Sequence, residues 1–366
     1  MHKFGFKDTY PQAMSNHLKK LLASCFLISV LTANVCLAQE DLARFLNAGK
    51  ADASLLMQSY LNPVVEGFSY GLNGGWYHTA KAHKTLGFDL GVGIHAVFVP
   101  TSKRFFDPSA LNLQTVSGFT STSPNGLAPT VIGADETTTY QLNADINGDG
   151  VVDSQDSFEG PPGLDLKKEI GTSAVPMATF QLGVGIYKNT DIKFRLVPEQ
   201  KVGDSKIKLI GFGIMHDVKQ HIPGIKLLPF DLSVLIGYTK ISGTAGLSGE
   251  FDSGGDTRPQ QLSMDMSAWL FQALISKKFS VVTFYGGIGY NAVKTDADVT
   301  GTYVIFDDPS GTNDIQFTDP VSMTFKNSSA RITAGIRLKF GPIYLNGDYT
   351  LQEYSTVSVG LGLSIR

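Results

Sequence analysis

The stretch ITAGIRLKFGPIYLNGDYTLQEYSTVSVGLGLSIR, residues 332–366, repeats one pattern three times. In each repeat apolar residues occupy every second position, and the positions between them hold mostly polar, charged or glycine residues. A β-strand sends successive side chains to opposite faces, so each repeat would form a strand with one apolar and one polar face. Gly341-Pro342 and a polar stretch at 352–356 separate the three runs, which predicts an antiparallel meander.

The same alternation recurs in much of the chain upstream. The clearest run, Leu86 to Phe98, has seven apolar residues at alternate positions. It is longer than the about 5–6 residues of an ordinary strand and the about 9–11 residues that a tilted strand needs to cross a bilayer. Eleven runs lie at 67–80, 86–98, 180–186, 192–196, 208–214, 230–238, 265–275, 282–290, 332–340, 343–351 and 357–365, and a hairpin with arms 303–306 and 321–325 is expected within 293–327.

The connections between these runs alternate in length. Short ones lie at Lys188-Asn189, Lys277-Lys278 and Gly341-Pro342, and long ones at 100–176, 242–259 and 293–327. A transmembrane barrel has short periplasmic turns, long outer loops, apolar residues toward lipid and polar or small residues toward the lumen. We therefore expect an all-β fold, a transmembrane antiparallel β-barrel over residues 67–366 with about 12 strands, in a range of roughly 10–14, because bacterial barrels have even strand numbers.

In a soluble β-sandwich, the alternative fold, the polar row of each strand would face water instead of a lumen. The charged residues of this row are Asp89, Lys193, Arg195, Asp231, Arg337, Lys339 and Asp348. Trp76, Trp269, Tyr238 and Tyr290 lie toward the ends of apolar rows, where they fit either an interfacial girdle or core packing.

The first residues have the order of a secretory signal peptide. Lys19-Lys20 is followed by an apolar run to Leu31 and by a small-residue region that ends at Ala38. We expect residues 1–38 to be the signal, with cleavage near Ala38-Gln39 and delivery to the outer membrane of a Gram-negative cell. A transmembrane anchor is the alternative.

Composition excludes several classes of protein. Both cysteines, Cys25 and Cys36, lie in the expected signal, so the mature chain would have no disulfide, no cysteine nucleophile and no cysteine-bound metal. The net charge of −3 argues against a nucleic-acid partner. Charged residues make up 17% of the chain, below the about 25% usual for soluble proteins.

Between the signal and the first strand run, residues 41–60 have helical spacing. Apolar residues recur there at intervals of three and four, and Asn62-Pro63 stops the pattern. We expect a short amphipathic helix within residues 39–66. It would pack on the sheet or plug the lumen of the barrel, and the sequence leaves both arrangements open.

One segment of the long loop 100–176 has the spacing of a calcium loop. Residues 145–156 place oxygen side chains at the first, third, fifth, ninth and twelfth positions, with Gly150 at the sixth for a sharp turn. Hard oxygen ligands suit Ca²⁺ better than transition metals. The predicted ligands are Asp145, Asn147, Asp149, Val151 through its carbonyl, Asp153 and Asp156.

The segment resembles the calcium loop of dockerin and EF-hand repeats, although its twelfth residue is Asp instead of Glu and it has no second copy. We predict a structural Ca²⁺ that orders the outer loop. The alternative is a polar turn that binds no ion.

Two histidine pairs are weaker candidates. His216 and His221 lie in a polar turn before Pro223, where a metal or catalytic pair is conceivable and a solvated turn is preferred. His78 and His83 are interpreted in the same way. The sequence has no Gly-x-Ser-x-Gly, no His-Glu-x-x-His and no phosphate loop, so we expect no enzyme.

Five stretches of the chain resemble an outer-membrane barrel family of Bacteroidetes-type bacteria, which is itself distantly similar to long-chain fatty-acid transporter barrels. These stretches are Tyr60–Phe68, Gly75-Trp76, Gly87–Asp89, Gly211–Asp217 and Leu228–Asp231. The resemblance implies a barrel in contact with outer-membrane lipid, and it implies no substrate.

Two functions stay open. One is a passive channel or transporter for small molecules, including hydrophobic ones. The other is a surface-binding, adhesion or structural barrel without transport. An outer-membrane hydrolase would need a nucleophile and a base that the sequence does not offer.

Overall fold

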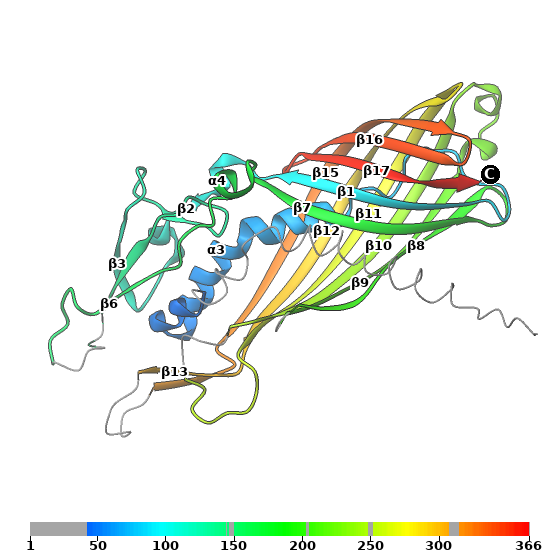
Figure 1. Ribbon diagram of the computed structural model, residues 1–366. Helices are drawn as coiled ribbons and strands as arrows, with labels where there is room; N and C mark the ends of the chain where they lie inside the picture. Colours follow the sequence, from blue (N-terminus) through cyan, green and yellow to red (C-terminus); the bar gives the residue numbers. More distant parts are fainter. Residues whose placement is uncertain are drawn as a thin grey trace, which may run out of the picture.

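The computed structural model describes residues 42–143, 145, 150–202, 205–247, 252–306 and 315–365, so the predicted signal peptide lies outside the described residues. Its centre is a closed antiparallel barrel with the strand order β1-β17-β16-β15-β12-β11-β10-β9-β8-β7 (Figure 1). Pairing of β1 with both β17 and β7 closes the barrel. The strands are β1 (Phe88–Phe98), β7 (Ala174–Gly185), β8 (Thr190–Val202), β9 (Ser205–Asp217), β10 (Asp231–Gly246), β11 (Gln261–Phe279), β12 (Val282–Thr300), β15 (Val321–Phe340), β16 (Ile343–Leu351) and β17 (Thr356–Ile365).

The described part of the chain therefore contributes ten barrel strands, at the lower end of the expected range and below its centre of 12. The expected strand at 67–80 is absent from the wall, because residues 67–72 are helical and the chain after them has no strand until Phe88. The expected hairpin is also different. Residues 321–325 begin β15, and β13 (Thr302–Phe306) pairs with β14 (Ile315–Thr318) outside the barrel.

The N-terminal helix is longer than predicted. A 3-10 turn, η1 (Ala43–Ala48), leads into α3 (Gly49–Leu72), which continues through Pro63 although a proline was expected to stop it. Proline removes one helical hydrogen bond, and the turns that follow it pack against the sheet. A Cβ atom on Gly67 would lie 2.7 Å from Val175 Cγ2 of β7, so glycine permits this close packing. In the described residues, no helix is long and apolar enough to cross a membrane.

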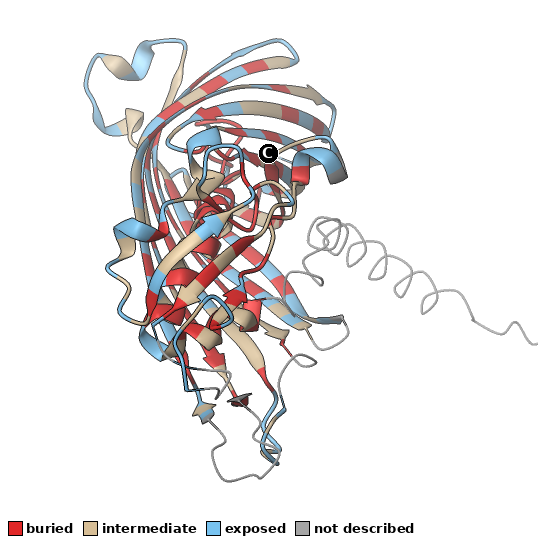
Figure 2. Ribbon diagram, turned by 90° about the vertical axis from the view of Figure 1, so that its left-hand side faces the viewer, coloured by how far each residue is buried: buried red, intermediate tan, exposed pale blue. Residues whose placement is uncertain are grey.

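Along the barrel strands, buried and exposed residues alternate (Figure 2). Large apolar side chains point outward, as at Ile94, Ile288 and Leu361, which are 57%, 63% and 57% exposed. The polar row points inward, where Lys193 and Arg195 are buried. The wall is therefore apolar outside and polar inside, as predicted for a barrel and opposite to a soluble sandwich.

The long connections gather at one end of the barrel. The connection between β1 and β7 is the longest, and in its sheets β2 pairs with β4, β3 with β5, and β5 with β6. Its elements are η2 (Thr101–Lys103), β2 (Phe105–Phe106), η3 (Pro108–Leu111), β3 (Val116–Ser121), β4 (Ala128–Pro129), β5 (Thr138–Leu142), β6 (Ser157–Glu159) and α4 (Leu166–Ile170). We call residues 99–173 the loop region. At the opposite end, η4 (Lys219–His221) and η5 (Ile225–Leu227) join β9 to β10.

Candidate functional site in the barrel lumen

Residues 49–87, named here the plug segment, extend from the loop region into the barrel lumen. They comprise α3 and the chain that follows it, which passes from the end with the long loops to the end where β1 begins (Figure 1). Contacts reach different walls: Gln58 Nε2 donates to Thr324 O of β15 at 3.1 Å, and Asn73 Nδ2 donates to Trp269 O of β11 at 3.3 Å. Gly71 packs against β7. Of the two arrangements left open by the sequence, the helix adopts the plug.

The C-terminal end of α3 is held by two buried arginines from opposite walls. Arg195 of β8 donates to Leu72 O at 2.7 Å and to Gly74 O at 2.6 Å, and Arg331 of β15 donates to Asn73 O at 2.8 Å. The last carbonyls of a helix have no partner within the helix and form the negative end of its dipole, so guanidinium groups suit them. We call Arg195 and Arg331 the arginine clamp.

Trp76 follows the clamp and fills a space that two wall glycines provide. A Cβ atom on Gly213 would lie 2.6 Å from Trp76 Cζ3, and one on Gly237 would lie 2.8 Å from Trp76 Cε2. The guanidinium carbon of Arg195 lies 3.8 Å from the centre of the indole ring, a cation–π contact. Of the two roles predicted for Trp76, the structure therefore selects core packing over a membrane girdle.

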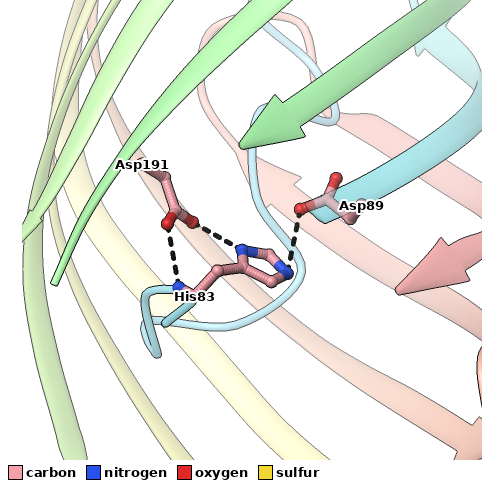
Figure 3. Close-up of side chains that lie close together, drawn as sticks. All are labelled: His83, Asp89 and Asp191. Carbon is pink, nitrogen blue, oxygen red and sulfur yellow. Dashed lines mark hydrogen bonds and ion pairs between the residues drawn. The ribbon is translucent and has the colours of Figure 1, made fainter. Parts of the chain in front are cut away.

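The last part of the plug segment is attached by His83 (Figure 3). Its backbone N donates to Asp191 Oδ1 at 2.8 Å, and its ring Nδ1 lies 2.9 Å from Asp191 Oδ2. On the other side of the ring, Nε2 lies 3.5 Å from Asp89 Oδ2. Lys193 Nζ lies 3.9 Å from the same oxygen, and all four side chains are buried. We call these four residues the His83 lock.

Three members of the lock have side chains that can bind metals, and their ligand atoms lie within 4.8 Å of one another. They are His83, Asp89 and Asp191. However, the two ring nitrogens face different carboxylates, so the imidazole bridges the acids and does not converge with them on one point. A transition metal requires all its ligand atoms about 2.0–2.2 Å from the ion. The ammonium of Lys193 already supplies a positive charge beside Asp89. The arrangement fits an ion-pair attachment better than a metal centre.

A small polar cavity lies beside the plug segment. Its volume is about 20 Å³, and its lining includes His78, His95 and Asn346. A cavity of this size holds a single water molecule. Gly91 makes room for a side chain that enters the lumen, because a Cβ atom at Gly91 would overlap the hydroxyl of Tyr344. This part of the lumen therefore admits water but no larger solute.

Sequence reasoning located some of these residues and missed others. Arg195, Lys193 and Asp89 were expected to face the lumen from their place in the polar row, and they do. The expectation that His78 and His83 lie in a solvated turn is wrong, since both are buried. Their local sequence gave no signal, because the partner of His83 lies 108 residues away.

The predicted calcium ligands lie in the loop region. Asn147 and Asp149 are outside the described residues. Asp145 Oδ2 accepts from Gly150 N at 2.8 Å, and Gly150 has a left-handed φ of 84°. Buried Asp156 accepts from Asp153 N at 2.9 Å through Oδ2, and the side chain of Val151 is exposed. The backbone thus brings Asp153 to Asp156 and turns sharply at Gly150, while the ion itself stays a prediction.

Comparisons with known proteins give one family and several distant barrels. Residues 16–365 match the family described as "Family of unknown function (DUF6588)". A search of curated proteins gave no match.

Among solved structures, the translocator domain of the autotransporter NalP from Neisseria meningitidis is 12% identical, with 88% of this chain and 99% of that chain covered and a TM-score of 0.28. The transport unit of the autotransporter AIDA-I from Escherichia coli is 9% identical, with coverages of 83% and 99% and a TM-score of 0.32. Ail, the attachment invasion locus protein of Yersinia pestis, is 11% identical, with coverages of 48% and 95% and a TM-score of 0.24. At these TM-scores none of the likenesses transfers a function to this chain.

Proposed function

We propose that this chain, which belongs to the family of unknown function DUF6588, is an outer-membrane β-barrel closed by its own plug segment, with the loop region as a binding surface. The observation that carries the proposal is the contact of residues 49–87 with opposite walls of the lumen, through Arg195 on one side and Arg331 on the other. A barrel filled in this way does not act as a permanently open channel.

The proposed partner of the outer wall is outer-membrane lipid. Exposed apolar side chains occur on strands around the barrel, among them Phe194, Phe271 and Leu345. Soluble monomers rarely expose contiguous apolar surface beyond a few hundred Å². A closed barrel satisfies its backbone hydrogen bonds internally, so lipid can cover this surface without stranding polar groups.

The loop region shares an apolar core with the plug segment, which would hold it as an ordered surface for partners outside the cell. Tyr140 stacks on Phe158 at 5.2 Å between ring centres, and Leu142 N donates to Asp156 O at 2.8 Å. We propose that Ca²⁺ at residues 145–156 stabilises this region as a structural ion. No catalytic role is proposed.

The calcium proposal has a direct test. Calorimetry of the refolded chain should give heat on addition of Ca²⁺, and Asp145→Ala should abolish it, because removal of one charged ligand weakens a hard-cation site strongly. Asp135→Ala, which alters an exposed acid elsewhere in the loop region, is the matched control. Absence of heat at millimolar Ca²⁺ in the wild-type chain would sink the proposal.

The closed-barrel proposal is tested in planar bilayers. The wild-type chain should give no steady conductance. The double variant Arg195→Gln/Arg331→Gln should give one, because it removes the guanidinium groups that hold the end of α3. Lys240→Gln, on an exposed lysine of β10, serves as the control and should stay closed. A steady wild-type conductance would contradict the closed barrel.

A second candidate function is passive transport of small hydrophobic molecules. It is favoured by an open recess on the outer wall, lined by residues such as Phe284, Ile336 and Val359, which offers apolar side chains to a hydrophobic molecule that arrives through the lipid. Liposome uptake of a fluorescent fatty acid discriminates the two functions. Uptake by the wild-type chain supports transport. The closed barrel is supported if there is no uptake and if cells that carry the protein bind immobilised glycans only when the loop region is present.

A further inference from the structure

His216 and His221 lie at the barrel end opposite the loop region. His216 is the second-last residue of β9, and His221 ends η4 in the connection to β10. Their Nε2 atoms are 3.0 Å apart, and the rings stack at 25° with 5.2 Å between centres. His216 is half-buried and His221 is exposed. The expected solvated turn thus contains two imidazoles whose outer nitrogens face each other.

This geometry restricts where the protons lie. Two Nε2 atoms at 3.0 Å cannot both carry a hydrogen, so a single proton or a cation must lie between them. Thr190 Oγ1 lies 2.8 Å from His216 Nδ1 and donates its own hydrogen to Lys188 O at 3.5 Å. The hydroxyl is thus placed to accept from Nδ1–H of His216. In this tautomer Nε2 of His216 has a lone pair that is directed at His221, with the amide Nε2 of Gln220 at 3.4 Å from it.

The same arrangement matches a pair of metal ligands. Two imidazole nitrogens bound tetrahedrally at about 2.0–2.1 Å from zinc lie about 3.3 Å apart. Histidine ligands usually donate their other ring N–H to an oxygen, as His216 does to Thr190. Imidazole favours zinc, copper and nickel over calcium and magnesium.

We propose that His216 and His221 form a two-histidine site for a borderline divalent metal ion, with water in the remaining positions. Exposure of His221 allows its proton to move to Nδ1 through solvent, which frees Nε2 for the ion. The open positions make the bound ion exchangeable, unlike an ion in a closed structural site. The site is separate from the plug segment and from the calcium prediction, so it does not depend on the proposed function.

The surrounding turn holds the two rings in place. Gln220 Nε2 donates to Asp217 O at 2.8 Å, and Asp217 Oδ1 accepts from Lys219 N at 2.9 Å. The ammonium of Lys219 donates to Phe230 O at 2.5 Å, so its charge is engaged at the far side of the connection. A turn fixed in this way keeps both ligands converged before the ion arrives.

The test is a Zn²⁺ titration of the refolded full chain in detergent, with saturating Ca²⁺ and a chromophoric chelator as competitor. One Zn²⁺ per chain should bind. His221→Ala should remove this binding, and Thr190→Val should weaken it about 10-fold, since it removes the acceptor that orients His216. Lys226→Ala, an exposed lysine of the same connection, should bind as the wild-type chain does.

A second readout counts the ligands. Electron spin echo spectra of bound Cu²⁺ should show two imidazole nitrogens in the wild-type chain and one in His221→Ala. Because His221 is exposed, its replacement leaves the barrel intact and the comparison valid. The proposal is overturned if no Zn²⁺ binds at up to millimolar concentration, or if His221→Ala binds Zn²⁺ unchanged.

Discussion

At the end with the long loops, the plug segment shares a large apolar core with the loop region, whereas toward the opposite end buried charged side chains are added to a smaller apolar cluster around Trp76. Phe45, which precedes the plug, packs edge-on against Tyr60 and Tyr140, with 5.7 and 6.0 Å between ring centres. The other end depends on the arginine clamp and the His83 lock. Apolar burial contributes free energy in proportion to area and has no direction, whereas buried charges need specific partners. The larger apolar core at the loop end should therefore contribute most of the stability, whereas the buried charges also fix the position of the plug segment.

The largest effect should come from the apolar end. Phe45→Ala should lower the free energy of unfolding by about 3–5 kcal/mol, because it leaves a cavity between aromatic rings in a buried core. Denaturant unfolding of the vesicle-bound protein measures this, with the exposed Leu227→Ala as control. A loss below about 1 kcal/mol would show that the loop end does not anchor the plug.

A somewhat smaller effect is expected at the charged end. Arg195→Met should cost about 2–4 kcal/mol, since Leu72 O and Gly74 O lose charged hydrogen-bond donors inside the lumen. Arg195→Lys should lose part of the same free energy of unfolding, because an ammonium group cannot reproduce the paired hydrogen bonds of a planar guanidinium. Unfolding together with single-channel recording checks both. An Arg195→Met barrel that is as stable and as closed as the wild type would reject the clamp.

Disturbing the packing of Trp76 against the wall should lower the free energy of unfolding by an intermediate amount. Gly213→Ala should destabilise the protein by about 1–3 kcal/mol, because its new methyl group would overlap the indole ring. Gly347→Ala is the matched control, since its Cβ would meet only Ser358 O at 3.7 Å. Unfolding with tryptophan emission as the signal measures both variants, and equal costs would argue against a specific fit.

The smallest effect is a dependence on pH at the loop end. Burial by itself raises the pKa of Asp52, but hydrogen bonds from the backbone N–H groups of residues 114–116 and from the Thr115 hydroxyl outweigh it and lower that pKa. A carboxyl with a lower pKa when folded stabilises the fold above its unfolded pKa of about 3.9. This stabilisation is lost as the pH falls through the folded pKa.

Asp52→Asn should therefore be less stable than the wild-type chain at pH 7, and the difference should shrink below about pH 4. Unfolding of both proteins across this range is the measurement. Asp107→Asn, which alters an exposed acid of the same region, controls for the general effect of acid. A difference that stays constant with pH would assign the effect to packing instead of charge.

The sequence predicted the wall better than its contents. The alternation from Leu86 to Phe98 became β1 with its apolar side outward. The meander from Ile332 onward became the second half of β15, then β16 and β17. Residues 67–76 alternate in the same way and yet form the end of a helix and a lumen loop. A period of two describes only which side chains share a face, and the neighbours decide whether that face joins a sheet.

By itself, the sequence determined that this protein has long strands with one apolar and one polar face, because that pattern is local and repeats every two residues. Only the tertiary structure decided that ten strands of the described residues close the wall and that the plug segment enters it. Those outcomes depend on partners far apart in the chain, such as His83 with Asp191 and Leu72 with Arg195. Such partners meet only once the barrel has closed around the plug.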